Sequence, residues 1–444
     1  MTVSSEPPAT VVAGGLVYLD GDPVAQQRDL RLAGGVVAEV GEPGVRLAAD
    51  GAALLDAGGK LVVPGLVDTH LHLWQTPLRG MTADLWAREY FHTVHPMSQY
   101  YTPEDMYWAT YAGGLELLAH GVTQVFDYCH SVNSPEHADA SLRGLRDAGI
   151  RATYGFGLFE RESATYADRA HRLDDLARVT EAVAGEPLVD IALALDHAYD
   201  DQAVGLAREL GLGISVHGNP VGLADQFAAA GALAPDVLWV HGNYASEREL
   251  DALAASGASL SLTPDIEMGM GKPTAIFDRA VRRGIPIALG VDVVSYACAD
   301  LLTQMRLAYA LHRVIDGEKE RARGHVPPHR DTDVPLVSTR DVVRWATTNG
   351  RRALGDRDHQ GIRAGAPADL LLVETEPWGL SLGDPAGHLV LQTTSRDVDT
   401  VLVAGEVRVR GGRLVGIDGP EISARLAESR DRLLATRDLA LSTH

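Results

Sequence analysis

The sequence has few or none of the features that mark several large classes of protein. It contains 444 residues but only two cysteines, Cys129 and Cys298, so we do not expect a disulfide framework. It has no run of about eighteen apolar residues, which argues against a membrane-spanning helix. The N-terminal residues show no basic stretch followed by an apolar one, so we expect no signal peptide. Together these absences predict a cytoplasmic protein.

Basic residues are also in short supply. Asp and Glu number 60 against 39 Lys and Arg, which gives a formal net charge of −21. Nucleic acid is therefore not an expected partner, because phosphate binding needs clustered Lys and Arg. An acidic surface also keeps a protein in solution. With 45% hydrophobic residues, the chain can bury a large core and form more than one domain.

The two ends of the chain share one pattern. Residues 10–63 contain short β-branched stretches separated by Gly and Asp, and the same pattern returns at 368–373 and 400–409. We predict that residues 1–63 and 365–444 form one small β-sandwich domain. The C-terminal part ends in an amphipathic pattern over 421–438, which predicts a terminal helix.

The middle of the chain alternates between short apolar strands and helical patterns. We expect helices at Pro103–His120, Ser246–Ala255 and Pro273–Arg283, and a surface loop at Asp316–Pro335. Eight such units predict an α/β fold with a (β/α)8 barrel over residues 64–364. The alternative, a doubly wound open sheet, is disfavoured because no Gly-rich phosphate turn follows the first strand. The eight expected strands are 64–72, 121–128, 150–158, 188–195, 212–219, 236–243, 257–263 and 286–292.

Metal-binding residue types occur where these strands end. His70 and His72 close the first strand, and side chains two residues apart on a strand point to the same face. His217, His241 and Asp292 end the fifth, sixth and eighth strands. In such a barrel the carboxyl ends of the strands carry the catalytic groups. Imidazoles with one carboxylate suit a divalent metal with an open position for water, with Zn²⁺ favoured and Fe²⁺ as the alternative. Asp292 is suited to bind the metal and to take a proton from metal-bound water, and His241 to bind the metal or the water.

With these residues in view, the chain resembles the amidohydrolase superfamily, in the branch of atrazine chlorohydrolase, adenosylhomocysteine deaminase and cytosine deaminase. The resemblance rests on Pro64–His72, His217, His241 and Gly290–Asp292, and on the later stretches 346–355 and 361–370. It implies one metal held by His70, His72, His217 and Asp292, with His241 beside the water. The fourth strand offers no bridging Lys, which favours a mononuclear site. Relatives commonly form dimers, so we expect a homodimer or larger homo-oligomer.

The sequence departs from this branch at one position. Its deaminases carry a proton-shuttling Glu three residues after the fifth-strand histidine, where this chain has Pro220. Ammonia leaves poorly without a proton, and a general acid contributes about 10²–10⁴ in rate. Either another acid replaces it, with Glu267 or Asp265 as the candidates reaching back over the mouth, or the leaving group departs unprotonated. A solvated or loop-capping role for these two carboxylates is an equal alternative.

Four further residues are candidates for substrate binding by position. Trp74 and Gln75 follow the histidine pair and are suited to stack on and orient a substrate, and Asn219 shares a strand face with His217. His130 follows the second strand, where a structural role is equally expected.

We therefore predict a mononuclear metal-dependent hydrolase. Metal-bound hydroxide would attack a small, heterocyclic substrate and break a C–N or C–halogen bond. Three alternatives stay open: a nucleobase-type deaminase that uses Glu267 as its acid, a metal-dependent decarboxylase, and a non-catalytic binding protein on the same fold. A decarboxylase needs a cation for the carboxylate, and Arg79 is the nearest candidate in sequence.

Overall fold

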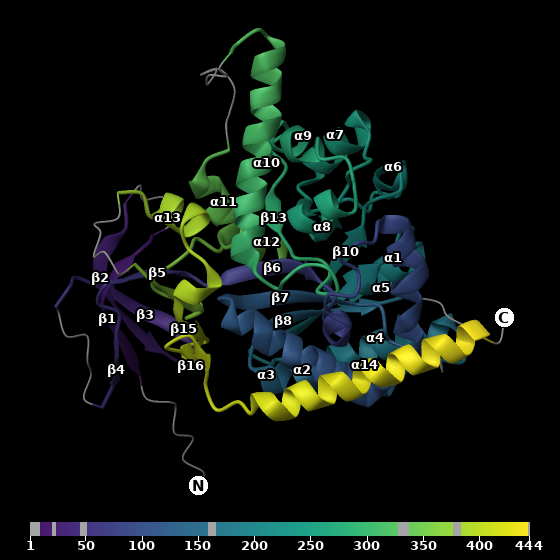
Figure 1. Ribbon diagram of the computed structural model, residues 1–444, viewed down its shortest axis with the longest axis horizontal. Helices are drawn as coiled ribbons and strands as arrows, with labels where there is room; N and C mark the ends of the chain where they lie inside the picture. Colours follow the sequence, from purple (N-terminus) through teal and green to yellow (C-terminus); the bar gives the residue numbers. More distant parts are fainter. Residues whose placement is uncertain are drawn as a thin grey trace.

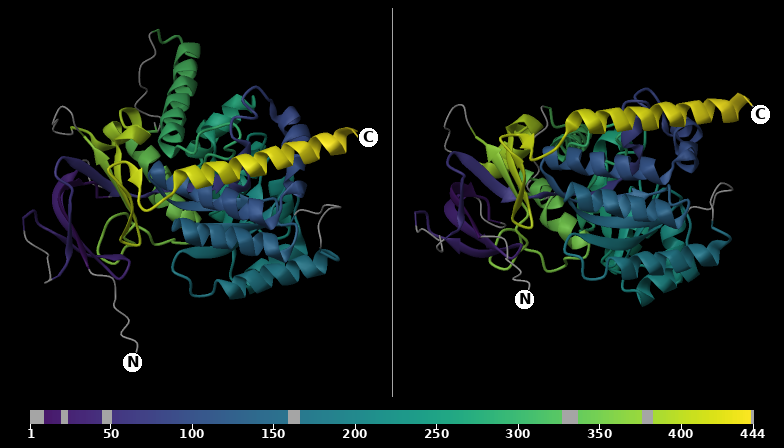
Figure 2. Two further views of the ribbon diagram at one scale, coloured as in Figure 1. Left: turned by 60° about the horizontal axis from the view of Figure 1, so that its bottom comes forward. Right: turned by 90° about the horizontal axis from the view of Figure 1, so that it is seen from below.

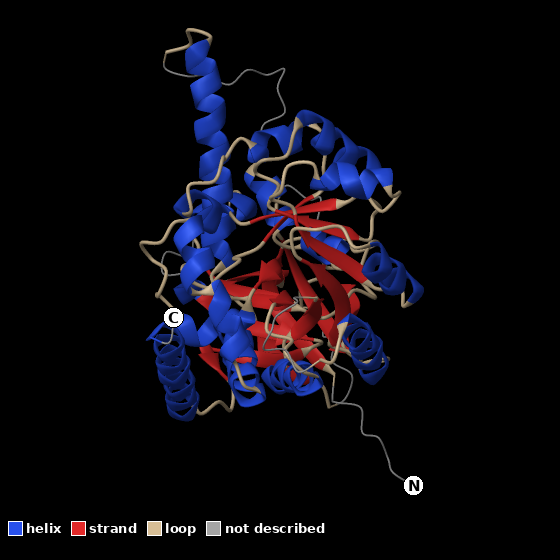
Figure 3. Cartoon of the chain, turned by 90° about the vertical axis from the view of Figure 1, so that its right-hand side faces the viewer, coloured by secondary structure: helices blue, strands red, loops and turns tan. Residues whose placement is uncertain are grey.

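A barrel of eight parallel strands forms the centre of the molecule (Figure 3). The computed structural model describes residues 9–19, 24–44, 51–158, 166–326, 337–375 and 383–442. Neighbouring barrel strands pair in chain order, and their side chains are mostly buried, as expected for strands covered by helices on one side and filled on the other. The predicted α/β barrel is confirmed. Its strands are β6 (Leu66–Leu71), β7 (Val122–Cys129), β8 (Arg151–Gly157), β9 (Val189–Leu195), β10 (Gly213–His217), β11 (Val237–Val240), β12 (Ser259–Leu262) and β13 (Ile287–Leu289).

Helices surround these strands on the outside (Figures 1 and 3). The predicted helices at 103–120, 246–255 and 273–283 are present as α2, α7 and α9, and Thr102 and Ser246 each begin theirs with a capping box. The α-helices are α1 (Ala87–Thr93), α2 (Pro103–Ala119), α3 (Pro135–Ala148), α4 (Arg169–Ala182), α5 (Asp201–Glu209), α6 (Leu223–Ala229), α7 (Glu247–Ser256), α8 (Pro264–Gly269), α9 (Ile276–Arg282), α10 (Leu301–Ala322), α11 (Thr339–Trp345), α12 (Thr348–Ala353), α13 (Pro385–Leu391) and α14 (Gly419–Ser442). Short 3₁₀ helices are η1 (Leu73–Leu78), η2 (His95–Tyr100) and η3 (Ser395–Asp397).

The barrel closes between its first and last strands. The backbone N–H of Asp292 donates to the carbonyl of His70 at 2.8 Å, and the N–H of His72 donates to the carbonyl of Asp292 at 2.9 Å. A parallel bridge also joins Leu71 to Asp292. The ends of β6 and β13 therefore meet at three of the predicted metal ligands.

Strands from both ends of the chain form a second sheet beside the barrel (Figure 2). It has its own buried apolar core, which includes Val17, Leu30 and Leu370. Chain-end strands pair as predicted, and hydrogen bonds join all nine into one sheet. Its last N-terminal strand ends at Pro64, two residues before the barrel begins. The strands are β1 (Thr10–Val17), β2 (Gln26–Ala33), β3 (Val36–Gly41), β4 (Ala53–Asp56), β5 (Lys60–Pro64), β14 (Leu370–Glu374), β15 (Val398–Val403), β16 (Glu406–Arg410) and β17 (Arg413–Leu414).

Two predictions concern the long helices. The terminal helix is present as α14, which lies along the outside of the barrel beside α2 (Figure 2). The predicted loop at 316–335 is wrong over 316–322, because α10 continues to Ala322. Its charged residues are spaced for helical ion pairs, such as Arg321 with Glu318, so charge there marks an exposed helix face and not a loop. Residues 327–335 lie outside the described residues. No helix among the described residues is long and apolar enough to cross a membrane.

Candidate metal centre

Five predicted ligands converge at the carboxyl end of the barrel. The Nε2 atoms of His70 and His72 lie 3.4 and 3.2 Å from Oδ1 of Asp292, and Nε2 of His241 lies 3.5 Å from its Oδ2. His217 joins them through its Nε2, which lies 3.1 Å from Nε2 of His70. All five side chains are buried. The barrel therefore brings together residues from four strand ends around one point.

Hydrogen bonds behind the rings fix which nitrogen faces this point. Nδ1 of His72 lies 2.8 Å from the carbonyl oxygen of Tyr128, which can only accept, so Nδ1 carries the proton. Nδ1 of His217 likewise lies 2.8 Å from Oδ1 of Asp196. In the neutral rings, both Nε2 atoms then present lone pairs toward the centre.

These lone pairs face other electron-rich atoms. Nε2 of His72 points at a carboxylate oxygen of Asp292, and Nε2 of His217 points at a ring nitrogen of His70. The contact between His72 and Asp292 is repulsive unless a proton or a metal cation lies between the atoms, whereas a neutral His70 with its proton on Nε2 can donate to His217. Burial also lowers the pKa of His70 to about 4 and that of His217 to about 3, which disfavours the extra proton. The donor set therefore fits a divalent metal ion, and the rings are held as metal-binding histidines usually are.

The backbone at two of the ligands is strained. His241 and Asp292 adopt φ values of +67° and +75°, a left-handed conformation that costs of order 1–3 kcal/mol for residues other than Gly. Gly290 allows the last strand to approach the first, because a Cβ there would lie 2.7 Å from the carbonyl oxygen of His70. Strain and close approach at the ligands are typical of a functional site.

Behind His241 lies Glu267, on α8. Its Oε1 is 3.1 Å from Nδ1 of His241 and 3.2 Å from the backbone N–H of Thr263, which donates to it. The side chain is fully buried, so Glu267 does not reach over the mouth as predicted for a substitute acid. Asp265 does not reach there either, since it does not line the cavity. The position of Glu267 is that of a residue that orients His241.

A narrow cavity leads to the five ligands. Its volume is about 30 Å³, room for one or two water molecules. Among the described residues, the lining includes Tyr90 and Phe91 of α1, the predicted residues Asn219 and His130, and Lys272, which follows α8. A ring-sized substrate therefore needs some of these covering side chains to shift.

Two of the predicted substrate-binding residues lie elsewhere. Trp74 is fully buried beneath the cavity, with its ring 5.4 Å from Tyr101 and 6.1 Å from His130. Gln75 is also buried, where its amide donates to the hydroxyl of Tyr90 at 2.6 Å. Neither residue lines the cavity, because η1 turns both side chains inward directly after His72. Gln75 therefore affects the cavity only indirectly, through its hydrogen bond to Tyr90, which lines the cavity.

His130 and Asn219 lie where a substrate would contact them. The ring of His130 stacks on that of His217, with an interplanar angle of 6°. Asn219 turns toward the cavity, and its Oδ1 is buried without a hydrogen-bond partner among the described residues. Both positions agree with the predicted role, which remains a prediction.

Asp196 and Lys272 lie in the site but are absent from the sequence predictions. Asp196 follows β9 and orients His217. Its place at the carboxyl end of a barrel strand is a sequence signal that could have predicted it, although it belongs to no metal-binding motif. Its pKa lies well below the usual value because the interactions with His217 outweigh the burial that alone would raise it. Lys272 has no such signal in the sequence. Arg79, the predicted cation, lies outside the cavity lining and pairs with Glu116.

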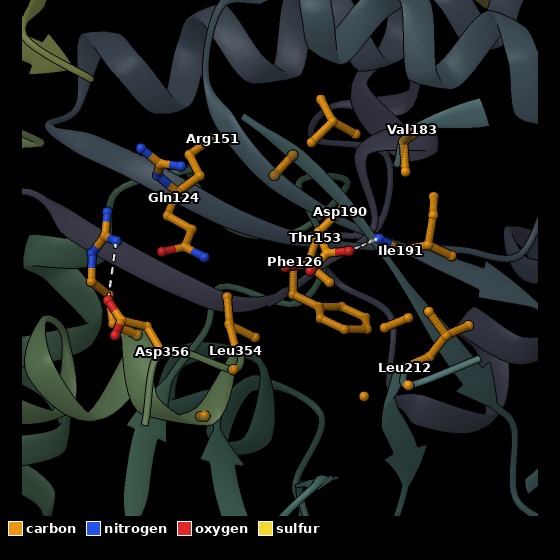
Figure 4. Close-up of a pocket in the computed structure, with 18 of the residues that line it drawn as sticks. Gln124, Phe126, Arg151, Thr153, Val183, Asp190, Ile191, Leu212, Leu354 and Asp356 are labelled. Atoms are coloured by element: carbon orange, nitrogen blue, oxygen red, sulfur yellow. Dashed lines mark hydrogen bonds and ion pairs between the residues drawn. The ribbon is translucent and has the colours of Figure 1, made fainter. Parts of the chain in front are cut away.

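A much larger cavity lies at the opposite, amino end of the strands (Figure 4). Its volume is about 840 Å³, and Gln124, Thr153 and Asp190 contribute to its wall. None of the clusters of metal-binding residue types among the described residues lies there. In barrels of this kind the amino end serves stability, and the active site lies at the carboxyl end.

The fold and the histidine cluster together define a barrel hydrolase of the metal-dependent class. The model of the Amidohydrolase family matches residues 61–408. The chain belongs to this family, which confirms the resemblance and the predicted hydrolysis of C–N or C–halogen bonds.

Individual relatives agree with this assignment. A 5-methylthioadenosine/S-adenosylhomocysteine deaminase of Nitratidesulfovibrio vulgaris is 27% identical, over 92% of this chain and 93% of its own. Among solved structures, an adenosine deaminase from Xanthomonas campestris with bound zinc superimposes with a TM-score of 0.83 at 22% identity, covering 97% of this chain and 99% of its own. The zinc complex of atrazine chlorohydrolase TrzN from Arthrobacter aurescens gives 0.79 at 20% identity, covering 95% and 100%. These solved structures support the same fold.

Proposed function

We propose that this protein is a mononuclear, zinc-dependent hydrolase of a small heterocyclic substrate. The observation that carries the proposal is the set of ring nitrogens that His72 and His217 turn toward Asp292 and His70, with their other nitrogens already engaged. In the proposal His70, His72, His217 and Asp292 hold the metal. Imidazole and carboxylate donors suit Zn²⁺, and solved relatives contain zinc.

Each side chain then has a distinct task. Zinc in such a site lowers the pKa of a coordinated water toward about 7. Asp292 lies against three histidine rings and is suited to accept the proton of the attacking water. His241, oriented by Glu267, is suited to hydrogen-bond the oxygen that becomes part of the product. Water supplies the new C–O bond, and the electron pair of the broken bond leaves with nitrogen or halide.

The leaving group decides between two versions of this reaction. Among the described residues that line the cavity, the carboxylates are Asp196 and Asp292, and both already contact histidine rings. The described lining therefore offers no additional carboxylic acid to protonate an amine, in agreement with Pro220 in place of Glu. This favours a leaving group that departs as a stable anion. Deamination is the second candidate, since the curated relatives include several deaminases.

A substrate screen that detects both products separates the two versions. Protein loaded with one equivalent of zinc is offered halogenated and aminated triazines, pyrimidines and purines, with ammonia and halide measured separately. Halide release without ammonia supports the first version, and ammonia release supports deamination. Full activity after complete removal of metal, measured by elemental analysis on the same sample, contradicts the proposal.

A further inference from the structure

Lys272 is an unpaired cation in the wall of the cavity. It lines the cavity together with His241, Asn219 and Met270. Among the described residues its ammonium group forms no ion pair within 4 Å, although the buried carboxylate of Glu267 interacts with it at longer range, and its backbone N–H donates to the carbonyl of Glu267 at 2.8 Å.

Lysine is rare in this chain, which makes the position informative. The 39 basic residues comprise 36 arginines and only three lysines, Lys60, Lys272 and Lys319. Lys60 pairs with Glu374 and Asp399, and Lys319 pairs with Asp278 and Asp316. In a protein with net charge −21, acidic residues are abundant, yet within the described part of the chain the ammonium group of Lys272 has no carboxylate at ion-pair distance. A cation kept without a partner beside a binding site is suited to an anionic ligand.

The charge around the cavity supports the same ligand. Asp196 and Asp292 are the carboxylates of the described lining, and a divalent metal would balance both. Lys272 is the only Lys or Arg among the described residues that line the cavity. The other polar side chains of the lining include Asn219, which carries no charge.

We propose that Lys272 binds an anionic group, a carboxylate, on the substrate, so that the substrate class is a small heterocyclic acid. The inference rests on the proposed function for the identity of the reaction, but the binding of an anion at Lys272 can be tested without it. Arginine elsewhere in the chain forms bidentate hydrogen bonds with carboxylates, as Arg146 does with Glu186. Lysine instead offers a compact charge on a flexible stem, which fits a narrow cavity.

The test uses the three lysines as probes. Reductive methylation with ¹³C-formaldehyde keeps the positive charge and labels only Lys60, Lys272, Lys319 and the N-terminus, and the variant K272R identifies the signal of Lys272. Zinc-loaded protein is titrated with nicotinate and with nicotinamide, which differ by the charge of one group. We expect nicotinate to shift the Lys272 signal at concentrations where nicotinamide does not, with the signals of Lys60 and Lys319 unchanged. Equal shifts with both probes, or no shift with either, overturn the inference.

Kinetics give an independent readout once a substrate is found. For an acidic substrate, K272M should raise KM by about 10–100-fold, with kcat changed little and K272R restoring part of the loss; for a neutral analogue of the same substrate, the rise in KM should be at least about tenfold smaller. A fall in kcat for neutral substrates would instead make Lys272 a proton donor and overturn the inference. The proposed function fails separately, if zinc-loaded protein hydrolyses none of the compounds while nicotinate still shifts Lys272.

Discussion

The two ends of the barrel differ in size and in chemistry. The cavity at the amino end is about 840 Å³ and is open among ordinary polar and apolar side chains, whereas the cavity at the carboxyl end is about 30 Å³. Yet the small one contains the converging histidines, strained backbone and oriented rings. Volume therefore does not locate the chemistry of this molecule. The active site is instead located by the high density of buried ionisable groups that orient one another. Burying such groups costs free energy, and a functional role accounts for that cost.

The largest effect should come from the carboxyl end. Asp292→Asn keeps the shape but removes the charge and the proton acceptor, so we expect kcat/KM to fall by at least about 10³ and the metal content to drop. Thr153→Val, in the wall of the amino-end cavity, should leave both unchanged within about twofold. Assays and elemental analysis of the two variants test the comparison directly. Comparable losses in both variants would mean that the amino end also takes part in the reaction.

A smaller loss is expected at the residue behind His241. Glu267→Gln keeps an oxygen that can accept from Nδ1 but removes the carboxylate charge, and substitutions in such positions typically cost about 10–100-fold in activity or metal affinity. We expect kcat to fall within this range while the protein folds and binds metal. The measurement is kcat over pH 5–9 beside the metal content. An unchanged rate and profile would show that Glu267 is only part of the core.

Close approach of the first and last strands can be tested through Gly290. A methyl group there would lie 2.7 Å from the carbonyl oxygen of His70, so Gly290→Ala should destabilise the protein by about 1–3 kcal/mol and weaken metal binding. Gly205→Ala on α5 is the matched control, since nothing lies within 4 Å of its added methyl and Ala favours a helix by about 1 kcal/mol. Denaturant unfolding measures both. Equal stability of the two variants would mean that the strand ends can separate without cost.

The smallest expected effect is the dependence of the apoprotein's stability on pH. Burial lowers the pKa of His70 to about 4, and the pKa of His359, near the amino end, also to about 4, both below the value of about 6.5 in the unfolded chain. Between these values the unfolded chain binds more protons. The contribution of these histidines to stability should therefore be complete above pH 6.5 and fall as the pH drops toward 4, by at most about 1.4 kcal/mol per pH unit for each such histidine.

Urea unfolding of the apoprotein between pH 4 and 8 measures this slope. His359→Asn should reduce it while the contribution of the buried cluster at the carboxyl end persists. The same slope in His359→Asn and in the parent protein would contradict the expectation.

The sequence predicts the fold and the candidate ligands well because both depend on local patterns. Alternating strands and helices fix the barrel, and the rule that strand ends share one face brings His217 and Asp292 to His70. Trp74 and Gln75 show the limit. They follow the histidine pair directly, but the 3₁₀ turn that begins at Leu73 directs both into the core. Periodicity alone does not report such a turn.

The sequence does not predict the site residues that lie beyond the barrel strands, for a different reason. Lys272 reaches the cavity because α8 ends and the chain turns back there, and no repeat or motif encodes that turn. The sequence offers Glu267 as a candidate acid, but its partner His241 lies on a different barrel unit, so only the three-dimensional structure shows that Glu267 faces a ring and not the mouth.

The hydrogen bonds that join the ends of β6 and β13 have a consequence for how the molecule unfolds. The hydrogen bonds that close the barrel alternate along the chain with the side chains proposed to hold the ion. An ion bound to His70 and Asp292 would thus act as a reversible cross-link across a loop of about 220 residues, where the entropy of ring closure is large. Loss of the ion and opening of the barrel would then be one cooperative event, and a chelator would act on the protein as a reductant acts on a protein with a long disulfide loop.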